Sequence, residues 1–509
     1  MSFKDGEGDA PGSLRRWLLA VLAVAAVVRA AAVYPSGKFP GDADALLTGM
    51  RTLDILTGRF HVFYSRARLG ALESYLHVPF VALLGPTRVA VSVAPLLEGV
   101  LAVYLVWLLA TRAFSPPVAL ISALFFAVPA FPFFQTTILP TLYATILVTG
   151  VAVLALAALY DEKPGPLVAL ALGIAAGLGL WCSIQTLSCT AAAGLWLLTR
   201  GRRIPRLSLA ITGGVGLLLG GLPWFAYNVE HRFESLRNNY GADLTRSFGS
   251  VFANALYGLT EGLPRLLTTP SPGGAIRLSA SCLLLFHAAA VIWFVASGLR
   301  ASRRSAWALP ALAALLSFVF FCVSSAGETR DTTVRFFILC YPLVAIADGL
   351  LVTSLWRRSR PAGIFLAAAV LALHAAAYES PWSEERRRRR EEASEDTRLL
   401  EFLRGEKIDA IIGDYWSVYP FNFLSAGRIR AISADPGVDY HEYGDRLPDY
   451  GVRWALVSGV PGVVEKWKAP MGTTKHVGRY TVLLPDQNPP PMSSTALRRR
   501  LQETFASGE

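Results

Sequence analysis

Residues 34–75 decide how the chain is organised, and they read YPSGKFPGDADALLTGMRTLDILTGRFHVFYSRARLGALESY. This stretch lies between two apolar segments and carries four acids, Asp42, Asp44, Asp54 and Glu73. Charged side chains so close to a membrane span are costly unless water or a ligand meets them. We therefore predict that the stretch lies at a bilayer surface and that the rest of the chain is the scaffold that holds it there.

The composition indicates a membrane protein. Of the 509 residues, 53% are hydrophobic and only 17% are charged, and the mean hydropathy is +0.42. Soluble globular proteins are about 25% charged. The net charge of +11 does not indicate a nucleic-acid partner, because the arginines cluster between apolar runs, which is the pattern of membrane topology. All five cysteines lie within apolar runs, so we expect no disulfide framework in the external loops.

Apolar runs of about 20 residues, the length that crosses a bilayer, recur along the chain. We predict about eleven spans, near residues 17–34, 89–110, 117–134, 138–160, 166–183, 185–199, 206–227, 279–298, 306–324, 335–356 and 361–378. The run at 71–85 is too short and too polar at its start to cross, and it predicts an interfacial helix. The expected fold class is therefore an all-α polytopic membrane protein with an external loop of amphipathic helices.

Basic residues predict the orientation of these spans. With a cytoplasmic N-terminus, every second loop is short and basic: the loops at Arg112 and Lys163 and those at 200–206, 300–304 and 357–360. We expect residues 1–16 to lie inside and a transmembrane domain to occupy 17–378, with a catalytic loop outside at 35–88. A further domain at 379–487, also outside, precedes a tail at 488–509.

The composition changes abruptly after Tyr378. A charged segment with helical spacing of Glu and Arg comes first, followed by four β-like runs, IDAIIG (408–413), RIRAIS (428–433), RWALVSG (453–459) and RYTVLLP (479–485). A short helix is expected at 419–424, between the first two runs. Strands that alternate with helical segments predict a small α/β domain. Glycine-rich phosphate loops are absent from it, so we do not expect it to bind a nucleotide.

Two acids just after the first span are candidate general bases. An acceptor hydroxyl or amine must lose a proton as it attacks, and a carboxylate within hydrogen-bond reach can take it. Asp42 and Asp44 are the catalytic candidates, and the sequence leaves the choice between them open. The alternative is structural, because Asp is also a preferred N-cap and Asp42 precedes a predicted helix that begins near Ala43.

Four arginines are candidate ligands for a phosphate group. Arg66 and Arg68 precede the interfacial helix, and Arg330 and Arg335 lie at the outer start of a late span. Guanidinium groups bind phosphate bidentately, and Arg335 is expected about one helical turn inside its span, where a charge is a functional candidate by default. The alternatives are snorkelling to lipid headgroups for the first pair and neutralisation by Asp331 for the second.

Four further residues are candidates for the acceptor side of the site: Glu73, Tyr75, His231 and Arg232. Glu73 is alternatively a favourable charge in the first turn of the interfacial helix. The alternative for the loop that holds His231 and Arg232 is an amphipathic surface helix. No His/Cys spacing indicates zinc. We identify no cofactor, and the sequence leaves a divalent metal open without supporting one.

Five segments carry a resemblance to a known family. They are the stretch that begins GDADALLTGMRTLDILTGRFHVFYSRARLGALESYLH, then GLGLWCSIQTL, GLPWFAYNVEHRFESL and VRFFILCYPLVA, and finally IDAIIGDYWSVYPFNFLSAGRIRAIS. In this order they resemble the polyprenyl-phosphate-sugar-dependent glycosyltransferases of the GT-C fold. The bacterial branch of the dolichyl-phosphate-mannose–protein mannosyltransferase superfamily (glycosyltransferase family 39 and RgtA/B/C/D-like proteins) is the most similar group. Relatives often have Asp-Glu where this chain has Asp-Ala-Asp.

The resemblance implies an inverting glycosyltransferase. It would move a sugar from a polyprenyl-phosphate carrier to an acceptor on the periplasmic face, with an Asp as base at Asp42 or Asp44. The expected partners are the lipid-linked sugar, membrane lipids, and a glycan, lipid or protein acceptor, and the expected location is the bacterial inner membrane. Two other functions stay open: a lipid or polysaccharide transporter, and an inactive GT-C homologue that acts as a scaffold.

Overall fold

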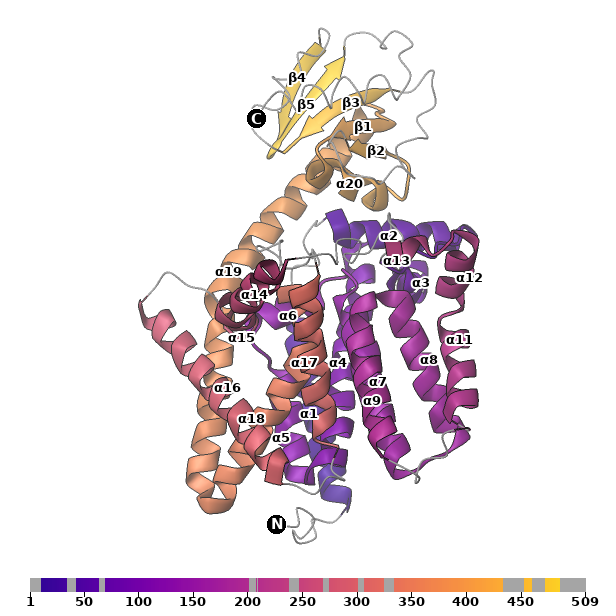
Figure 1. Ribbon diagram of the computed structural model, residues 1–509. Helices are drawn as coiled ribbons and strands as arrows, with labels where there is room; N and C mark the ends of the chain where they lie inside the picture. The colour runs from indigo at the N-terminus through magenta and orange to yellow at the C-terminus, as the bar shows by residue number, and fades with distance from the viewer. Residues whose placement is uncertain are drawn as a thin grey trace. The chain divides into compact units, whose positions relative to one another are not determined.

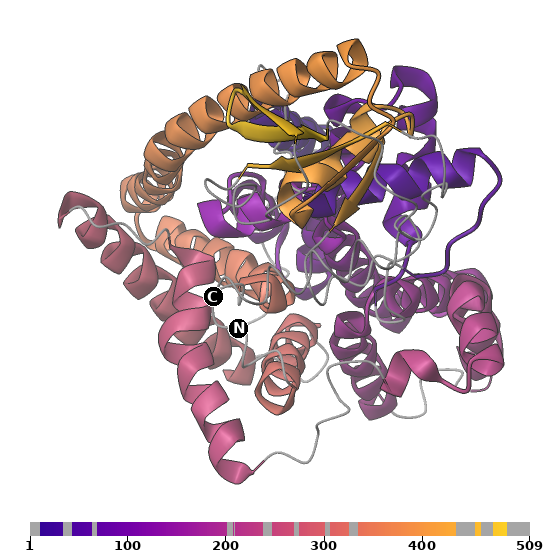
Figure 2. The same ribbon diagram turned by 90° about the horizontal axis from the view of Figure 1, so that it is seen from above.

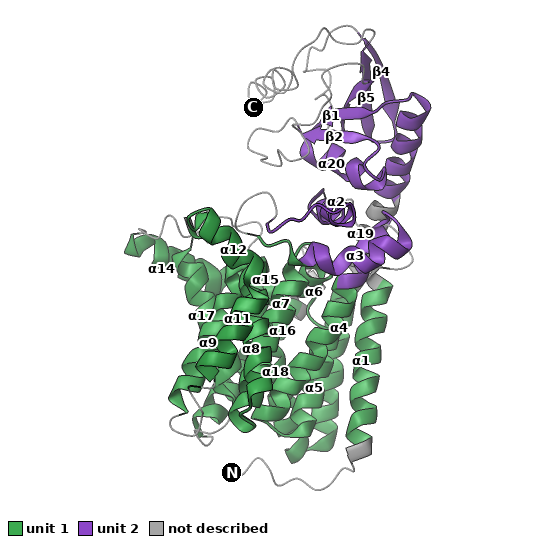
Figure 3. Ribbon diagram, turned by 90° about the vertical axis from the view of Figure 1, so that its right-hand side faces the viewer, with its two compact units in different colours: residues 1–32, 67–72, 95–382 green, residues 33–66, 73–94, 383–509 purple. Residues whose placement is uncertain are grey.

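The computed structural model describes residues 11–33, 43–63, 69–200, 207, 209–237, 247–268, 274–300, 306–324, 334–433, 453–459 and 472–485. The chain divides into two compact units (Figure 3). Unit 1 comprises residues 1–32, 67–72 and 95–382, and unit 2 comprises 33–66, 73–94 and 383–509. Unit 2 therefore joins most of the polar stretch after the first span to the C-terminal region, whereas the sequence led us to assign these two regions to separate domains.

Unit 1 is a bundle of helices that run side by side (Figure 1). Figure 2 shows the same helices from above. Its helices are α1 (Pro11–Val33), most of α4 (Arg88–Ala113), α5 (Pro116–Ala127), α6 (Phe131–Ile138), α7 (Tyr143–Glu162), α8 (Pro166–Cys182), α9 (Leu187–Thr199), α11 (Gly214–Gly220), α12 (Leu222–Glu230), α13 (Glu234–Arg237), α14 (Phe248–Tyr257), α15 (Leu263–Leu267), α16 (Gly274–Arg300), α17 (Ala308–Val323), α18 (Tyr341–Arg358) and the first part of α19 (Arg360–Gly405).

The structure confirms the prediction of a mostly helical protein with several helices that could span a membrane. It does not confirm the predicted number of spans. Within the described ranges, five helices are long and apolar enough to cross a membrane, or up to seven if each of two bent helix pairs is one span. Helices at 166–182, 184–199 and 308–323 are apolar but shorter. The prediction of about eleven spans also counts runs whose helices are shorter than this, and that number stays a prediction.

Prolines change two of the predicted spans. The run predicted at 117–134 is broken: α5 ends at Ala127, α6 begins at Phe131, and the two helices are bent by 72°. Pro129 lies in the break, where it removes an amide donor and disfavours helical geometry at the residue before it. The predicted span 138–160 likewise begins late, because α7 starts only at Tyr143, after Pro140.

The break between α5 and α6 exposes backbone groups that the bundle must satisfy, since a buried amide or carbonyl without a partner is costly. Side chains from α1, α18 and α19 bond four consecutive residues of the break: Arg29 donates to the carbonyl of Ala127 (3.2 Å), His374 Nδ1 to that of Val128 (2.8 Å), Tyr378 to that of Pro129 (2.7 Å), and the hydroxyl of Tyr341 accepts the amide of Ala130 (2.8 Å). The kink is thus fixed by three distant helices. Arg29, which interrupts the first apolar run, has a structural role here.

The basic helix ends of unit 1 lie at one end of the bundle. Three arginines at the ends of α4, α9 and α18 contact residues at the ends of α7 and α5: Arg112 pairs with Glu162, Arg200 with Asp161 (3.0 Å), and Arg357 with Ser115 (3.2 Å). The basic helix ends at Arg112, Arg200 and Arg357 therefore lie near one another, and the orientation inferred from the positive-inside rule stays a prediction.

Unit 2 contains α2 (Ala43–Leu56), α3 (Leu72–Leu84), the last part of α19, α20 (Tyr415–Leu424) and a five-stranded sheet. The strands are β1 (Ala410–Gly413), β2 (Arg430–Ser433), β3 (Trp454–Ser458), β4 (Gly472–Val477) and β5 (Tyr480–Pro485), in the order β2-β1-β3-β5-β4. β1 is parallel to β2 and β3, and β5 is antiparallel to β3 and β4. The four predicted strands and the predicted short helix are present. β4 was missed because it is a mostly exposed, polar edge strand without apolar alternation.

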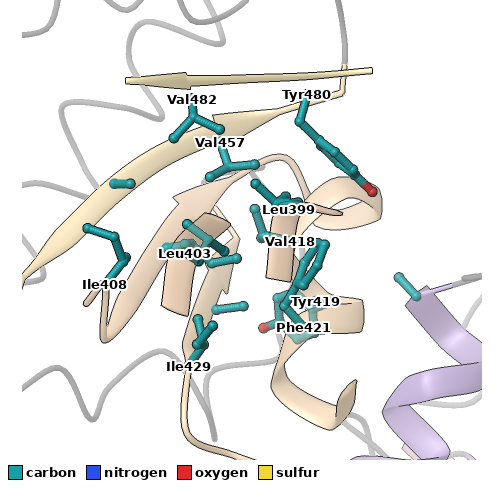
Figure 4. Close-up of a cluster of buried hydrophobic side chains, with 14 of the residues drawn as sticks. Leu399, Leu403, Ile408, Val418, Tyr419, Phe421, Ile429, Val457, Tyr480 and Val482 are labelled. Atoms are coloured by element: carbon teal, nitrogen blue, oxygen red, sulfur yellow. The ribbon is translucent and has the colours of Figure 1, made fainter. Parts of the chain in front are cut away.

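The core of unit 2 joins α2 to the C-terminal fold. Figure 4 shows the buried cluster formed by the sheet, α19 and α20, to which Ala43 and Leu47 of α2 also belong. Asp396 on α19 lies at one edge of this core and is buried. It accepts hydrogen bonds from Tyr480 (2.5 Å), Arg479 (3.1 Å) and Arg88 at the start of α4. Three separate parts of the chain are therefore tied together at one carboxylate.

Candidate functional site

Among the predicted acids that the structure describes, Asp44 is the most accessible. It lies in the first turn of α2 and its side chain is exposed. A negative charge is favourable there because the first amides of a helix leave a partial positive charge. The hydroxyl of Tyr415 donates to Asp44 Oδ1 at 2.6 Å. Asp42, the other candidate base, lies outside the described residues.

Tyr415 reaches Asp44 because the start of α20 is rigidly held. Asp414 caps that helix: its Oδ1 accepts the amide of Ser417 at 3.0 Å, and its Oδ2 accepts the hydroxyl of Ser458 at 2.9 Å. The side chain of Tyr415 is only 4% exposed and belongs to the core of unit 2. A buried tyrosine hydroxyl usually requires a partner, and the carboxylate of Asp44 provides one.

The other end of α2 carries a second group of polar contacts. Asp54 pairs with His61 Nε2 at 3.1 Å and with Arg59 at 3.5 Å. Tyr75, an acceptor-side candidate, donates from its hydroxyl to the carbonyl of His61 at 3.0 Å, and burial raises the pKa of Tyr75. Asp44 and Asp54 are ten residues apart on α2. The contacts of Asp54 are therefore about 15 Å from Asp44 along the helix axis.

Glu73 and His77 form a fully buried pair in α3. Their side chains lie one turn apart, with 3.7 Å between Glu73 Oε1 and His77 Nε2. Thr52 of α2 packs beside them and donates to the carbonyl of Ser74 at 3.0 Å. Glu73 is therefore part of the α2–α3 contact, and its acceptor-side role stays a prediction that requires this packing to open.

Arg335 is placed differently from our expectation. Residues 334–336 form a single 3₁₀ turn, followed by a second turn at Ile338–Cys340 and by α18 from Tyr341. Arg335 thus precedes α18 instead of lying one turn inside it, because the chain bends at Phe337 between the two 3₁₀ turns. Its guanidinium lies 5.1 Å from the ring centre of Phe336, and its buried Nε has no hydrogen-bond partner among the described residues. Arg66, Arg68 and Arg330 lie outside the described residues.

His231 and Arg232 follow the last turn of α12 and are exposed. His231 stacks on Tyr227, with 3.9 Å between the ring centres. Arg232 and Phe233 both have left-handed backbone angles, φ +52° and +58°, which non-glycine residues seldom adopt. The side chain of Asn228 holds this turn by accepting from Ser235. The turn is specified by its own sequence and presents two polar side chains.

The predicted site residues fall into two groups. Asp44, Glu73 and Tyr75 belong to unit 2, and His231, Arg232 and Arg335 belong to unit 1. Sequence reasoning missed Tyr415 altogether. No local signal could have found it, because the residue is 371 positions from its partner Asp44 and is typical of any aromatic core position.

The chemistry available at Asp44 is that of an exposed carboxylate with one oxygen bonded to a phenol. Such a group can accept a proton from an incoming hydroxyl or amine. Within the described ranges, no group of three or more His, Cys, Asp or Glu side chains is arranged to hold a metal ion.

Comparisons with known proteins agree with this architecture. Residues 72–227 match the family model described as dolichyl-phosphate-mannose-protein mannosyltransferase. The fold is similar to that of ArnT from Cupriavidus metallidurans bound to undecaprenyl phosphate, with a TM-score of 0.65 at 15% identity over 92% of this chain and 97% of that one. ArnT in the apo state gives 0.64 at 14% identity, covering 92% and 98%.

A more distant likeness is to the oligosaccharyltransferase AglB from Archaeoglobus fulgidus, solved with an inhibitory peptide and a dolichol-phosphate. Its TM-score is 0.51 at 12% identity, over 96% of this chain and 77% of that one. A search of curated protein sequences found no match. The resemblance predicted from the sequence is confirmed: the chain has the fold of GT-C glycosyltransferases such as ArnT and is similar to the dolichyl-phosphate-mannose-protein mannosyltransferase family over residues 72–227.

Proposed function

We propose that this chain is an integral membrane glycosyltransferase that uses a polyprenyl-phosphate carrier as its sugar donor. The observation that carries the proposal is the fold similarity to ArnT, which spans nearly the whole of both chains. ArnT was solved with undecaprenyl phosphate and AglB with a dolichol-phosphate, so two proteins of similar fold bind phosphorylated polyprenyl lipids. The family model that matches residues 72–227 also describes a transferase of sugar from such a lipid.

The proposed reaction takes place on the periplasmic face of a bacterial inner membrane. The positive-inside pattern puts the polar stretch after the first span on that face, where nucleotide sugars are absent and a lipid-linked donor is needed. The acceptor is a component of the cell envelope: a glycan, a lipid or a protein.

In the proposed mechanism, Asp42 or Asp44 accepts the proton of the acceptor hydroxyl or amine as that group attacks the anomeric carbon. A bond forms between acceptor and sugar, the bond from the anomeric carbon to the phosphate oxygen breaks, and the polyprenyl phosphate leaves with both electrons. Attack from the opposite face inverts the anomeric configuration. The exposed carboxylate of Asp44 in the first turn of α2 supports the role of base.

Arginines stabilise the leaving phosphate in this proposal. Preorganised charge at the place where charge develops is often the strongest single contribution to catalysis. Arg335 supports the assignment, because its half-buried guanidinium has an Nε without a partner among the described residues, and a phosphate oxygen would satisfy that donor. Arg66, Arg68 and Arg330 are proposed for the same role on their sequence positions alone.

The test uses the purified full-length chain in proteoliposomes that contain undecaprenyl-phosphate-linked sugars. Release of undecaprenyl phosphate is measured, and mass spectrometry of cell-envelope glycans from cells with and without the chain identifies the product. We expect release that depends on the chain and is lost in Asp42→Asn or Asp44→Asn, while Asp409→Asn, an exposed acid elsewhere in unit 2, is the matched control. Full release in both single variants would overturn the mechanism. Movement of intact donor across the bilayer without bond cleavage would instead indicate a transporter.

A further inference from the structure

We propose that Tyr415, on the first turn of α20, is a positioning residue for Asp44, so that the C-terminal α/β region is a working part of the transfer site. The inference rests on the proposed function and on the assignment of Asp44 as the base. Its starting point is the hydrogen bond of 2.6 Å from the Tyr415 hydroxyl to Asp44 Oδ1.

The two helices that carry this contact are packed together along their length. Ala43 and Leu47 of α2 belong to the same buried cluster as Tyr415. Leu46 and Met50, on the same helix, pack with Phe423 of α20 in a second cluster. Both helices are in unit 2. The orientation of α2, and with it the direction of Asp44, is therefore set by α20.

A glycine allows this close approach. A Cβ atom on Gly49 would lie 2.7 Å from the ring of Phe423, shorter than real Cβ contacts. The ring is fully buried, so it has little room to move. The absence of a side chain at this position lets α20 lie against α2, which brings Tyr415 within reach of Asp44 near one end of the contact.

The contact also fixes the direction of the Asp44 carboxylate. A phenol that donates at 2.6 Å makes a short, charge-assisted hydrogen bond, and it fixes Oδ1 and the plane of the carboxylate. The side chain stays exposed, so the carboxylate can meet an acceptor that arrives from solvent. Fixing a base in its productive direction raises the rate of proton transfer, because the orientation does not have to be found in each turnover.

The nature of the positioning group supports this role. Tyr415 is 4% exposed, and its ring lies against Tyr419 with 4.8 Å between ring centres. A buried ring has few alternative rotamers, so its hydroxyl is held in one position. Positioning groups of this kind act best when their own rotamers are held by packing.

The experiment compares Tyr415→Phe with Tyr419→Phe in the full-length chain in proteoliposomes, with an undecaprenyl-phosphate-linked sugar as donor. Tyr419 is the matched control, because it is a buried tyrosine of the same helix and the same cluster. We expect Tyr415→Phe to lower kcat about tenfold and to leave the KM for the donor within about twofold, since the lost interaction orients the base and does not bind substrate. Tyr419→Phe should change kcat by less than about twofold.

A second measurement does not depend on catalysis. Thermal unfolding of Tyr415→Phe, Asp44→Ala and the double variant forms a double-mutant cycle, because alanine, unlike asparagine, cannot accept from the Tyr415 hydroxyl. If the hydrogen bond is present, the second substitution adds little to the first, and the effects are non-additive. Additive effects would overturn the proposed contact, even if Tyr415→Phe proved hard to produce in active form.

The outcomes separate the inference from the proposed function. If the unmodified chain releases no undecaprenyl phosphate, the function fails, and the inference about catalysis fails with it. If the chain is active and Asp44→Asn is inactive, but Tyr415→Phe has the kcat of the unmodified chain, only the inference is overturned. If Asp44→Asn keeps full activity, Asp44 is not the base and the positioning role is likewise overturned.

Discussion

The break between α5 and α6 and the start of α2 are two places where distant side chains meet polar groups. At the break, the groups are backbone atoms inside the bundle, and Arg29, His374, Tyr378 and Tyr341 satisfy them. At α2, the group is the exposed carboxylate of Asp44, and Tyr415 donates to its Oδ1. The first arrangement stabilises a kink, because an unsatisfied backbone group in an apolar interior is costly. The second holds the proposed base, which stays in contact with solvent, as a group that accepts a proton from an incoming acceptor must.

The largest expected effect concerns the exposed carboxylate. Asp44→Asn removes the proposed base and should lower transfer by roughly 10²- to 10⁴-fold. The melting temperature should change little, because the amide can still accept from Tyr415. Transfer is measured as release of undecaprenyl phosphate, and stability as thermal unfolding. If the loss of transfer were accompanied by a large fall in the melting temperature, the prediction that Asp44 serves catalysis and not stability would be wrong.

The next effect is on the stability of unit 2. Asp396→Ala leaves Arg88 and Tyr480 without their buried partner, and breaking a buried ion pair on one side costs about 3–5 kcal/mol. Thermal unfolding should show a large decrease, whereas Asp409→Ala, at an exposed acid of the same unit, should change the unfolding temperature only slightly. Equal effects of the two substitutions would show that Asp396 is not the point that holds the three segments.

The kink in unit 1 should respond more weakly and only in stability. His374→Leu leaves the carbonyl of Val128 without its donor, which costs about 1–3 kcal/mol for a buried group. Activity per folded molecule should stay close to that of the unmodified chain. The control is His231→Leu, at an exposed histidine of unit 1, measured for thermal stability alone. A specific loss of kcat in His374→Leu would show that the kink also serves the chemistry.

The smallest effect is a pH dependence in unit 2. Burial and the charge of Asp396 raise the pKa of Tyr480. A group whose folded pKa is raised stabilises the fold fully below its unfolded pKa, about 10 for tyrosine, and this contribution is lost as the pH rises above that value. The free energy of unfolding should therefore fall by up to about 1.4 kcal/mol per pH unit above pH 10. Tyr480→Phe should flatten this dependence, as measured by denaturation between about pH 9 and 11.5, a range that brackets the ordinary pKa of tyrosine.

The membrane helices were mostly predictable from the sequence. Long apolar runs can only be buried in lipid or in a bundle, so they mark helices whatever their neighbours are. The failures came at prolines, as at Pro129, where the run of apolar residues continues although the helix cannot. In the C-terminal region the four apolar strands were predictable, whereas β4 was not, because its residues are held by pairing with β5 and not by burial.

The candidate site was predictable in its residue types but not in its geometry. Acids after the first span and arginines at helix ends are visible as costly charges next to apolar runs. The sequence suggested that Arg335 lies inside a helix, and the structure places it in a turn before α18. It left Glu73 open between an acceptor-side role and a favourable charge in the first turn of the interfacial helix, and the structure buries that side chain against His77. Periodicity locates elements, but it does not show which face of an element is covered.

By itself, the sequence determined that this is a helical membrane protein with a polar stretch after its first apolar run and a small α/β region near its end. Composition and hydropathy are sums over local residues, so no folded structure is needed to read them. Only the tertiary structure decided that α2 packs on α20 and that Tyr415 donates to Asp44, across 371 positions of sequence. That contact depends on which side chains share a core, and burial of apolar surface selects this arrangement without leaving a local pattern in the chain.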